Sequence, residues 1–333
     1  MGPMRIVFSD DGRDFSRRDW SGLVGADPAG TFFHYPAYLK LYWEEFGEAP
    51  EHLLLSFAEE ESGEQVGAGA FERIGRTLRF LGGTEVTDYM GPVAKPGCGE
   101  PMAKELFAGL VLRKDWDEAD LRGLPTDTAW LELLRAGAED QGLAVEVAED
   151  QNGLAPYLEL PASWDGYLAS LPSKLRHEIR RKPRKLESEA GGYRVVDTTG
   201  ETLARDLDRF VELHRSSEGP KGVFMQPGME IFFRRLGEAF LAGRIFRLTS
   251  LEVGDVRIAG TIGFLCGHTY YLYNSAFDHA WEHLSPGMVL VGEVIGRAIA
   301  EGCERFDLLK GDYAYKYRFG ARRRAVKRLV VRR

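Results

Sequence analysis

The feature that most constrains the fold is a helix start that follows an aromatic strand pattern. Residues 268–276 (HTYYLYNSA) alternate enough to predict a strand. Residues 285–287 (Ser-Pro-Gly) then predict a helix start, because serine caps well and proline fits the first helical turn. The helix continues to Ala300, and residues 304–309 predict a second strand. The segment therefore reads as strand, helix, strand.

A helix N-terminus just beyond a strand predicts an anion site. Its amide groups lack partners within the helix, and the helix dipole adds partial positive charge there. We therefore expect the phosphates of a donor molecule to bind at the start of this helix, on Ser285, Pro286, Gly287, Met288 and Val289.

The length and the order of predicted elements favour two similar domains. A chain of 333 residues exceeds the size at which single cores usually stop growing. Each half gives helices, a hairpin and then strand–helix–strand, which predicts an α+β fold of two tandem domains, each a mixed sheet flanked by helices. We expect an N-terminal domain at 1–155, a connector with a basic helix at 156–192, and a C-terminal domain at 193–333.

Two basic segments stand out on a chain of net charge −8. Residues 174–187 hold seven Lys/Arg and two Glu, and residues 318–333 hold eight Lys/Arg and no acid. Such patches predict either a polyanionic ligand (a nucleotide, tRNA or phospholipid) or a solvated helix face and a charged edge strand. Pro183 is expected to kink or restart the basic helix.

The cysteine pattern and the hydropathy predict a cytoplasmic protein. Cys98, Cys266 and Cys303 are far apart and odd in number, which is typical of a reducing compartment. No apolar run of about 18 residues predicts a membrane span, and the first residues carry no apolar signal core.

Several motifs resemble one known family. They are Tyr270-Tyr271-x-Tyr273-x-x-Ala276-x-Asp278, Ser285-Pro286-Gly287, Gly302-x-x-x-Phe306-Asp307-x-x-x-Gly311, Tyr315-Lys316, Phe80-Leu81-Gly82, Asp88-Tyr89-x-Gly91-Pro92 and Leu171-Pro172-Ser173-Lys174-x-Arg176. Over roughly residues 30–325 the chain resembles the GNAT-like acetyltransferases associated with the cellulose-biosynthesis protein CelD, which are related to the Fem transferases of peptidoglycan bridges.

The resemblance implies two tandem GNAT folds, with a C-terminal one that binds the acyl donor and a degenerate N-terminal one on the acceptor side. It implies that Lys316 contacts the substrate or the developing oxyanion. It also makes Tyr313, Tyr315 and Tyr317 candidates for protonating a leaving thiolate, since a tyrosine is protonated at neutral pH. Tyr313, Lys316 and Tyr317 are expected on one helical face. The chain lacks the familiar Arg/Gln-x-x-Gly-x-Gly/Ala donor loop.

Acyl transfer to an amine also needs a proton acceptor and substrate contacts. Asp278 and Asp307 follow strands beside the expected site, so either is a candidate base or a turn residue. Substrate contacts are expected from Asp88, Tyr89, Tyr273, Asn274, Lys174 and Arg176.

A zinc site is not expected. Residues 279–283 (His-Ala-Trp-Glu-His) match H-x-x-E-H, but they fall in a short loop with no evident third ligand.

The function predicted from sequence is N-acyl transfer from acyl-CoA or acetyl-CoA to a small-molecule, peptide or saccharide amine, without a metal and without DNA. One alternative is an aminoacyl-tRNA-dependent transferase whose basic helix grips tRNA. Another is a binding module that keeps the fold without the chemistry.

Overall fold

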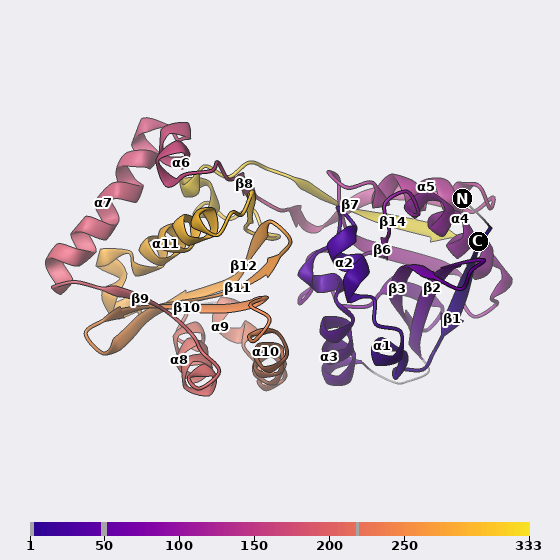
Figure 1. Cartoon of the computed structure of the whole chain (residues 1–333), viewed down its shortest axis with the longest axis horizontal. Coiled ribbons are helices and arrows are strands. Elements are labelled where there is room, and N and C mark those ends of the chain that lie inside the picture. Colours follow the sequence, from indigo (N-terminus) through magenta and orange to yellow (C-terminus); the bar gives the residue numbers. More distant parts are fainter. Residues whose placement is uncertain (1–2, 48–51, 218–219) are drawn as a thin grey trace. The chain divides into compact units, whose positions relative to one another are not determined.

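The computed structural model describes residues 3–47, 52–217 and 220–333. The chain forms two compact units (Figure 1). The first comprises Met1–Leu154 and Arg324–Arg333, and the second comprises Ala155–Arg323. The predicted α+β class is confirmed, because each unit has a mixed sheet flanked by helices.

In the described residues of the first unit, eight strands form one sheet in the order β1-β2-β3-β4-β6-β14-β7, with β5 beside β3. The strands are β1 (Met4–Ser9), β2 (Leu53–Glu60), β3 (Gln65–Ile74), β4 (Thr77–Phe80), β5 (Val93–Ala94), β6 (Glu118–Pro125), β7 (Ala144–Leu154) and β14 (Ala325–Arg332). The helices are α1 (Asp14–Arg17), α2 (Ser21–Ala26), η1 (Phe32–His34), α3 (Pro36–Phe46), α4 (Gly99–Leu112) and α5 (Trp130–Glu139).

The core of the first unit lies between its sheet and α4. The strand β2 is buried at all positions from Leu53 to Glu59, which suits a strand covered on both faces. The helix α4 buries residues at i, i+3 and i+4 spacing: Met102, Ala103, Leu106, Phe107 and Leu110. This stripe packs in one cluster with the strands and with α5.

In the described residues of the second unit, six strands follow the order β8-β13-β12-β11-β10-β9. They are β8 (Tyr157–Glu159), β9 (Arg194–Asp197), β10 (Phe246–Val253), β11 (Val256–Cys266), β12 (Thr269–Phe277) and β13 (Arg305–Asp307). The helices are α6 (Trp164–Ser170), α7 (Ser173–Ala190), α8 (Leu203–Arg215), α9 (Pro220–Phe224), α10 (Pro227–Phe240), η3 (His279–Leu284), α11 (Pro286–Ala300) and η4 (Lys316–Phe319).

Helices cover both faces of the second sheet. Figure 1 shows α6, α7 and α11 on one face and α8 and α10 on the other. The helix α11 is apolar on most sides and packs against β11, β12 and α7. Its buried residues form one cluster with those of α6 and α7. The basic helix is thus part of the second unit and packs on the helix that begins at the proposed donor site.

The two units share one topology. In each, four antiparallel neighbours (β1 to β4, or β9 to β12) are followed by a helix and by a strand parallel to the fourth. Helices α1 to α3 and α8 to α10 lie at the same point in the two series, between the first and the second strand. The coarse repetition of elements in the sequence therefore reflects a repeated strand order.

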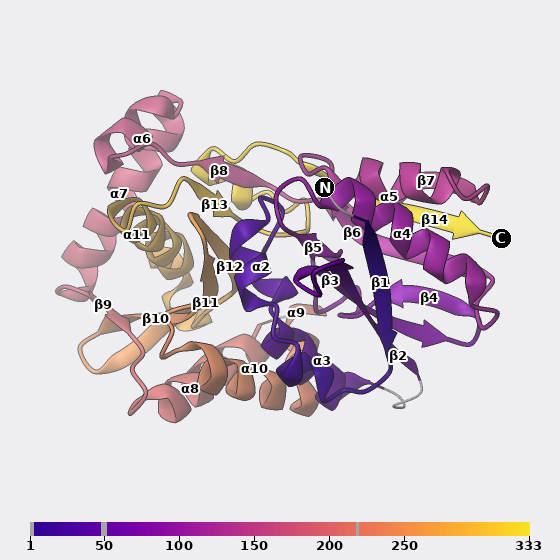
Figure 2. The same ribbon diagram turned by 45° about the vertical axis from the view of Figure 1, so that its right-hand side comes forward.

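Two expectations about the chain's layout need correction. Residues 324–333, expected in the C-terminal domain, pair as β14 with β6 and β7 of the first sheet, and Figure 2 shows this yellow strand beside them. Strand pairing is non-local, so the strand pattern alone did not reveal its partner. The helix α7 does not restart at Pro183, because it runs through this residue from Ser173 to Ala190, and a kink there stays a prediction.

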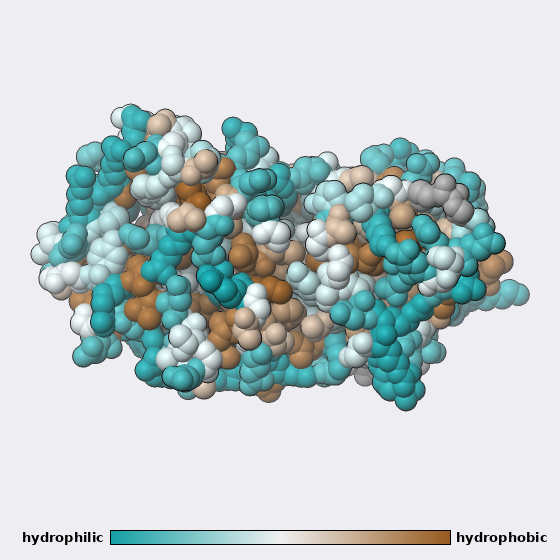
Figure 3. Space-filling model, viewed as in Figure 1, coloured by the Kyte–Doolittle hydropathy of each residue, from teal (hydrophilic) through white to brown (hydrophobic). Residues whose placement is uncertain are grey.

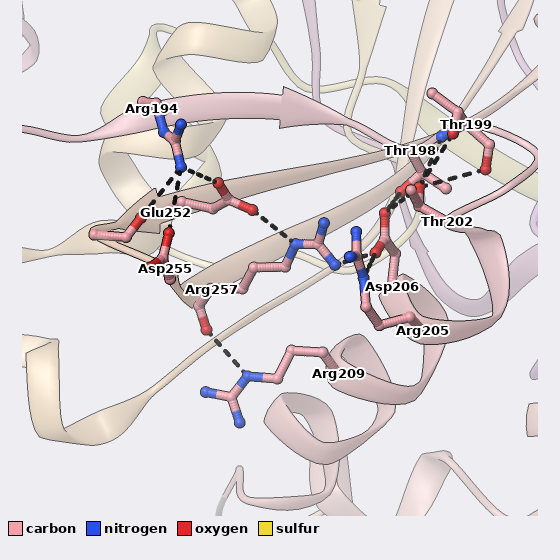
Figure 4. Close-up of polar contacts among 11 residues, drawn as sticks. Arg194, Thr198, Thr199, Thr202, Arg205, Asp206, Arg209, Glu252, Asp255 and Arg257 are labelled. Atoms are coloured by element: carbon pink, nitrogen blue, oxygen red, sulfur yellow. Dashed lines mark hydrogen bonds and ion pairs between the residues drawn. The ribbon is translucent and has the colours of Figure 1, made fainter.

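A buried carboxylate fixes α8 to the second sheet (Figure 4). Asp206 accepts hydrogen bonds from Thr198 and Thr202 at 2.8 and 2.7 Å, and it is also bonded to Arg205 and Arg257. Burial would raise the pKa of Asp206, but these hydrogen bonds together hold it below its ordinary value. The carboxylate therefore stays charged in the fold.

Candidate active site

The second sheet opens where β12 and β13 part. Thr269–Tyr271 of β12 pairs with Arg305–Asp307 of β13, whereas β12 runs on to Phe277. On the other side, Ile262 pairs with Asn274 and Gly263 pairs with Leu272, so Tyr273 is an extra residue in β12. Bulges re-aim the strand locally. The C-terminal half of β12 thus presents an edge that β13 does not cover.

The helix α11 begins beside this edge. Ser285 is its N-cap residue in the left-handed region (φ 55°), and Pro286 occupies the first turn, as predicted. The amides of Met288 and Val289 both donate to the Ser285 carbonyl, at 3.0 and 3.1 Å. Of the predicted amides, that of Gly287 remains for a ligand. Fewer backbone amides are therefore open to a ligand at this turn than the sequence predicted.

The first turn of α11 packs closely on the end of β12. A Cβ at Gly287 would lie 3.2 Å from Phe277 Cδ1. Gly287, Met288 and Ser285 are half-buried, whereas Pro286 and Val289 are buried. A side chain at position 287 would therefore press on the Phe277 ring, which would have to shift by a few tenths of an ångström, and the turn keeps access to solvent.

The basic helix α7 reaches the same turn. Lys182 Nζ donates to Ser285 Oγ at 2.8 Å, and Lys185 Nζ donates to the His283 carbonyl at 2.9 Å. The Ser285 hydroxyl therefore binds a lysine, whereas the sequence predicted that it would cap α11. Burial lowers the pKa of Lys182, and the nearby charges of Arg181, Arg318 and Lys185 lower it further against the opposite effect of Glu178.

Lys316, the first residue of η4, is buried beside the turn that follows β13. Its ammonium donates to the carbonyls of Leu309 and Lys310, both at 2.8 Å. Leu309 has a positive φ of 60°, which is uncommon for a branched side chain. The lysine thus fixes the turn that follows β13, close to where the strands part, and its direct contact with substrate stays a prediction.

The three tyrosines near Lys316 have different surroundings. Tyr313 is 60% exposed and lies before η4, and the Lys316 ammonium is 5.4 Å from its ring centroid. Burial raises the pKa of Tyr315 to about 12, with a smaller contribution from Tyr313. Tyr317 is bonded to Asp312. The expected shared helical face is wrong, because η4 starts only at Lys316 and Tyr313 lies outside it.

Both candidate bases accept hydrogen bonds from nearby backbone amides. Asp278 caps η3 by accepting from the Ala280 amide at 3.0 Å, and it lies 3.4 Å from Arg209 Nη2. Asp307 is buried and accepts from the Leu309 amide at 2.8 Å. Their role as proton acceptors stays a prediction.

Tyr273 and Asn274 lie at the bulge of β12. The Tyr273 ring packs against Phe233 and Phe264, with centroids 5.2 and 5.9 Å apart. Asn274 Oδ1 accepts from the Ser275 amide at 2.9 Å and lies 3.2 Å from Nε2 of the buried His214. His214, on α8, was not singled out from the sequence.

The remaining predicted substrate residues are divided between the units. Tyr89 is buried in the first unit, where the Arg324 guanidinium stacks 4.7 Å over its ring and bonds its hydroxyl. Asp88 precedes it and is half-buried. Lys174 and Arg176 lie in the first turn of α7 in the second unit.

The described residues contain no group of three side chains suited to a metal ion. The H-x-x-E-H segment forms η3, in which His279 Nδ1 lies 3.8 Å from Glu282 Oε2. Across residues 3–47, 52–217 and 220–333, no helix is long and apolar enough to cross a membrane.

The segment that contains α7, the bulged β12, α11 and β13 has a family match. Residues 173–317 match the acetyltransferase (GNAT) domain. This segment of the second unit is thus similar to a GNAT acetyltransferase domain, and the strand parting and the start of α11 lie within the matched residues. No curated protein matches the chain in sequence.

Solved structures share the fold over nearly the whole chain. A conserved protein of unknown function from Bacteroides thetaiotaomicron has a TM-score of 0.67 at 14% identity, covering 98% of this chain and 100% of its own. FemX has a TM-score of 0.65 at 11% identity, covering 92% and 94%. The C-terminal domain of a putative lysylphosphatidylglycerol synthetase from Agrobacterium fabrum has 0.57 at 12%, covering 97% and 92%. At these identities the similarity establishes the fold.

Lys182 was not predicted from the sequence as a site residue. Lys182 lies between the buried Ile179 and Leu186 of α7 at helical spacing, which places it on the packed face of the helix. A lysine at such a position faces a neighbouring element, so its spacing was the available signal.

Proposed function

We propose that the second unit transfers an acyl group from a thioester donor of the acyl-CoA type to an amine. The main support is the uncovered edge of β12 beside the start of α11, within the segment that matches the GNAT domain. A thioester carbonyl placed along this edge would have backbone hydrogen-bond donors near it, and the donor's phosphates would lie at the turn around Gly287.

The chemistry follows from that placement. The amine nitrogen attacks the thioester carbonyl, a C–N bond forms, and the C–S bond breaks when the oxyanion collapses. Lys316, whose ammonium is held on the turn that follows β13, adds positive charge near the developing oxyanion. Tyr315, with a pKa of about 12, is protonated at neutral pH and suits a proton donor to the thiolate. Asp278 or Asp307 is the candidate acceptor of the ammonium proton.

We further propose that the chain is of the CelD-associated type and acts in the cytoplasm. The motifs around Ser285 and Lys316 support the first point. The odd number of cysteines, at the buried positions 98, 266 and 303, fits a reducing compartment and supports the second.

A thiol-release assay with acetyl-CoA and a panel of amines tests the proposal. Gly287→Ala should reduce kcat/KM about 10-fold, because the added methyl group meets Phe277 where the donor's phosphates approach. The matched control is Gly243→Ala, whose Cβ would meet only ordinary contacts at 3.9 Å or more. Equal loss in both variants, or no thiol release with any amine, would contradict the proposal.

A second candidate is transfer from aminoacyl-tRNA, favoured by the exposed cations of α7 that include Lys174. Bulk tRNA binding that weakens steeply with salt would support this alternative. Absence of both tRNA binding and thermal stabilisation by acyl-CoA would favour a non-catalytic module.

A further inference from the structure

A buried histidine on α8 is bonded to the bulge of β12. His214 is 0% exposed, and its ring lies between those of Phe210 and Phe224, with centroids 6.0 and 5.9 Å away. Its Nε2 atom lies 3.2 Å from Asn274 Oδ1. A buried polar ring lowers stability unless it is hydrogen-bonded, and an apolar ring would suit these neighbours better. The histidine is therefore informative through the group that it bonds.

The contacts of Asn274 decide which atoms donate and which accept. The Ser275 backbone amide, which can only donate, lies 2.9 Å from Asn274 Oδ1. This atom is therefore the oxygen of the side-chain amide and not its nitrogen. Because that oxygen can only accept, Nε2 of His214 must carry a proton and donate to it. Two donors thus hold the Asn274 oxygen in place.

The nitrogen of the Asn274 amide is left for a ligand. Both hydrogen bonds of the side chain use Oδ1, and within residues 3–47, 52–217 and 220–333 no group accepts from Nδ2. This nitrogen is also not fully buried. It carries two N–H groups whose direction is fixed by the bonds to the oxygen. Such a donor is suited to bind an oxygen atom of a small molecule.

The bulge places this donor on the face of the sheet opposite α11. Tyr273 packs against Phe233 of α10, and the next residue, Asn274, contacts α8, so two consecutive side chains share the face that α8 and α10 cover (Figure 1). The strand β13 pairs with β12 only as far as Tyr271, so β12 is uncovered at Asn274. A thioester held beside α11 would be approached from the other face by the amine. Asn274 therefore lies on the side of the acceptor.

The surroundings of this amide are largely apolar. The rings of Phe224, Phe233 and Tyr273 lie around the bonded pair of His214 and Asn274. Figure 3 shows apolar surface among hydrophilic side chains in the region of β12 and α10. In such a place a ligand that lacks an oxygen leaves the N–H groups without water and without a partner, which discriminates against it.

We propose that Asn274, held by His214, binds an oxygen of the acceptor and so selects amines that carry a hydroxyl or carbonyl oxygen near the nitrogen. The inference rests on the proposed function and names the acceptor class of the same site. Because Oδ1 already accepts from His214 and Ser275, the side chain offers the acceptor only donors. Amino alcohols, amino sugars and amino acid amides have the matching oxygen, and simple alkylamines do not. His214 acts through Asn274 and is a positioning residue.

Steady-state acyl transfer from acetyl-CoA to matched amines tests the assignment. The pairs are ethanolamine with propylamine, and glucosamine with cyclohexylamine. In the unaltered chain we expect kcat/KM to be at least about 10-fold higher for the amine that carries oxygen. Asn274→Leu keeps a similar volume without the donor, so this preference should fall to about 1, and the KM for acetyl-CoA should not change.

Variants of His214 test the positioning role. His214→Phe keeps a ring without the donor and should raise the KM for ethanolamine about 10-fold, with little change in kcat. His214→Gln, which keeps an N–H group, should recover most of this loss. The matched control is His177→Gln, an exposed histidine on α7, which should behave as the unaltered chain. The double variant with Asn274→Leu should lose no more than Asn274→Leu alone, because the two residues act as one unit. Circular dichroism checks that each variant is folded.

The outcomes separate this inference from the proposed function. An oxygen preference that survives in Asn274→Leu overturns the inference and leaves acyl transfer standing. Losses that add in the double variant overturn the role of His214. Nitrogen-15 spectra of the histidine-labelled chain give a readout that needs no activity: a proton on Nε2 of His214 is expected, and a neutral ring protonated only on Nδ1 overturns the inference. Absence of thiol release with every amine overturns the proposed function and the inference with it.

Discussion

Replacing Asp206 by alanine should locally destabilise α8 in the second unit. The side chain of Asp206 is 1% exposed and that of its partner Arg257 is 9% exposed. Removing one member of a buried ion pair costs about 3–5 kcal/mol. Arg257 keeps Glu252 at 3.1 Å, so we expect a value near the lower limit, about 3 kcal/mol. The matched control is Asp208→Ala on the same helix.

Asp208 pairs with Arg234 at the surface, with its side chain 61% exposed. Its loss should cost about 0–1 kcal/mol. Native-state hydrogen exchange on peptides covering α8 measures the opening free energy there, which whole-chain unfolding of two units would obscure. A loss of 3 kcal/mol accelerates exchange about 100-fold. Equal acceleration in the two variants would refute the assigned role of the buried carboxylate.

Three further predictions follow from the second unit. Folding lowers the pKa of Asp206, so the stabilisation by this carboxylate is present above the ordinary aspartate pKa of about 3.9 and is lost as pH falls through the folded value. In this acidic range, hydrogen exchange in α8 of the unaltered chain should approach that of Asp206→Ala. A difference between the two chains that stays constant with pH would contradict the linkage. Burial raises the pKa of the Cys303 thiol to about 11. This thiol should therefore resist a disulfide reagent at pH 8 in the native chain and react rapidly in urea. Fast labelling of Cys303 in the native chain, located by peptide mass spectrometry, would contradict its burial. Lys316→Met leaves the carbonyls of Leu309 and Lys310 without the ammonium. It should lower the local opening free energy by about 2–3 kcal/mol, measured by native-state hydrogen exchange on peptides covering 305–319, whereas Lys310→Met should have little effect. Similar losses in the two variants would count against the anchoring role.

Local sequence patterns were sufficient for much of the second unit. The apolar spacing of residues 203–215 predicts a helix, and these are the observed bounds of α8, because one face of that helix is buried along its length. The Ser-Pro-Gly signal placed the start of α11 at the observed residue, since capping and proline geometry are local properties. Predictions of this kind need only the residues within one or two turns.

Contacts between distant segments were not predictable in the same way. The pairing of β14 with β6 and β7 depends on partners nearly 200 residues away. The bond from Lys182 to Ser285 joins residues 103 positions apart. Lys316 was singled out through a family motif, and only the structure places its ammonium on two carbonyls. Such contacts arise when packing brings the segments together.

The central claim is that the second unit binds an acyl donor where β12 and β13 part. Hydrogen–deuterium exchange with and without saturating acetyl-CoA tests it most directly, because exchange locates protection along the chain. We predict slower exchange in peptides covering 269–277 and 285–292, with no change in the strands at 53–80. Protection confined to the first unit, or no protection at any peptide, would contradict the claim.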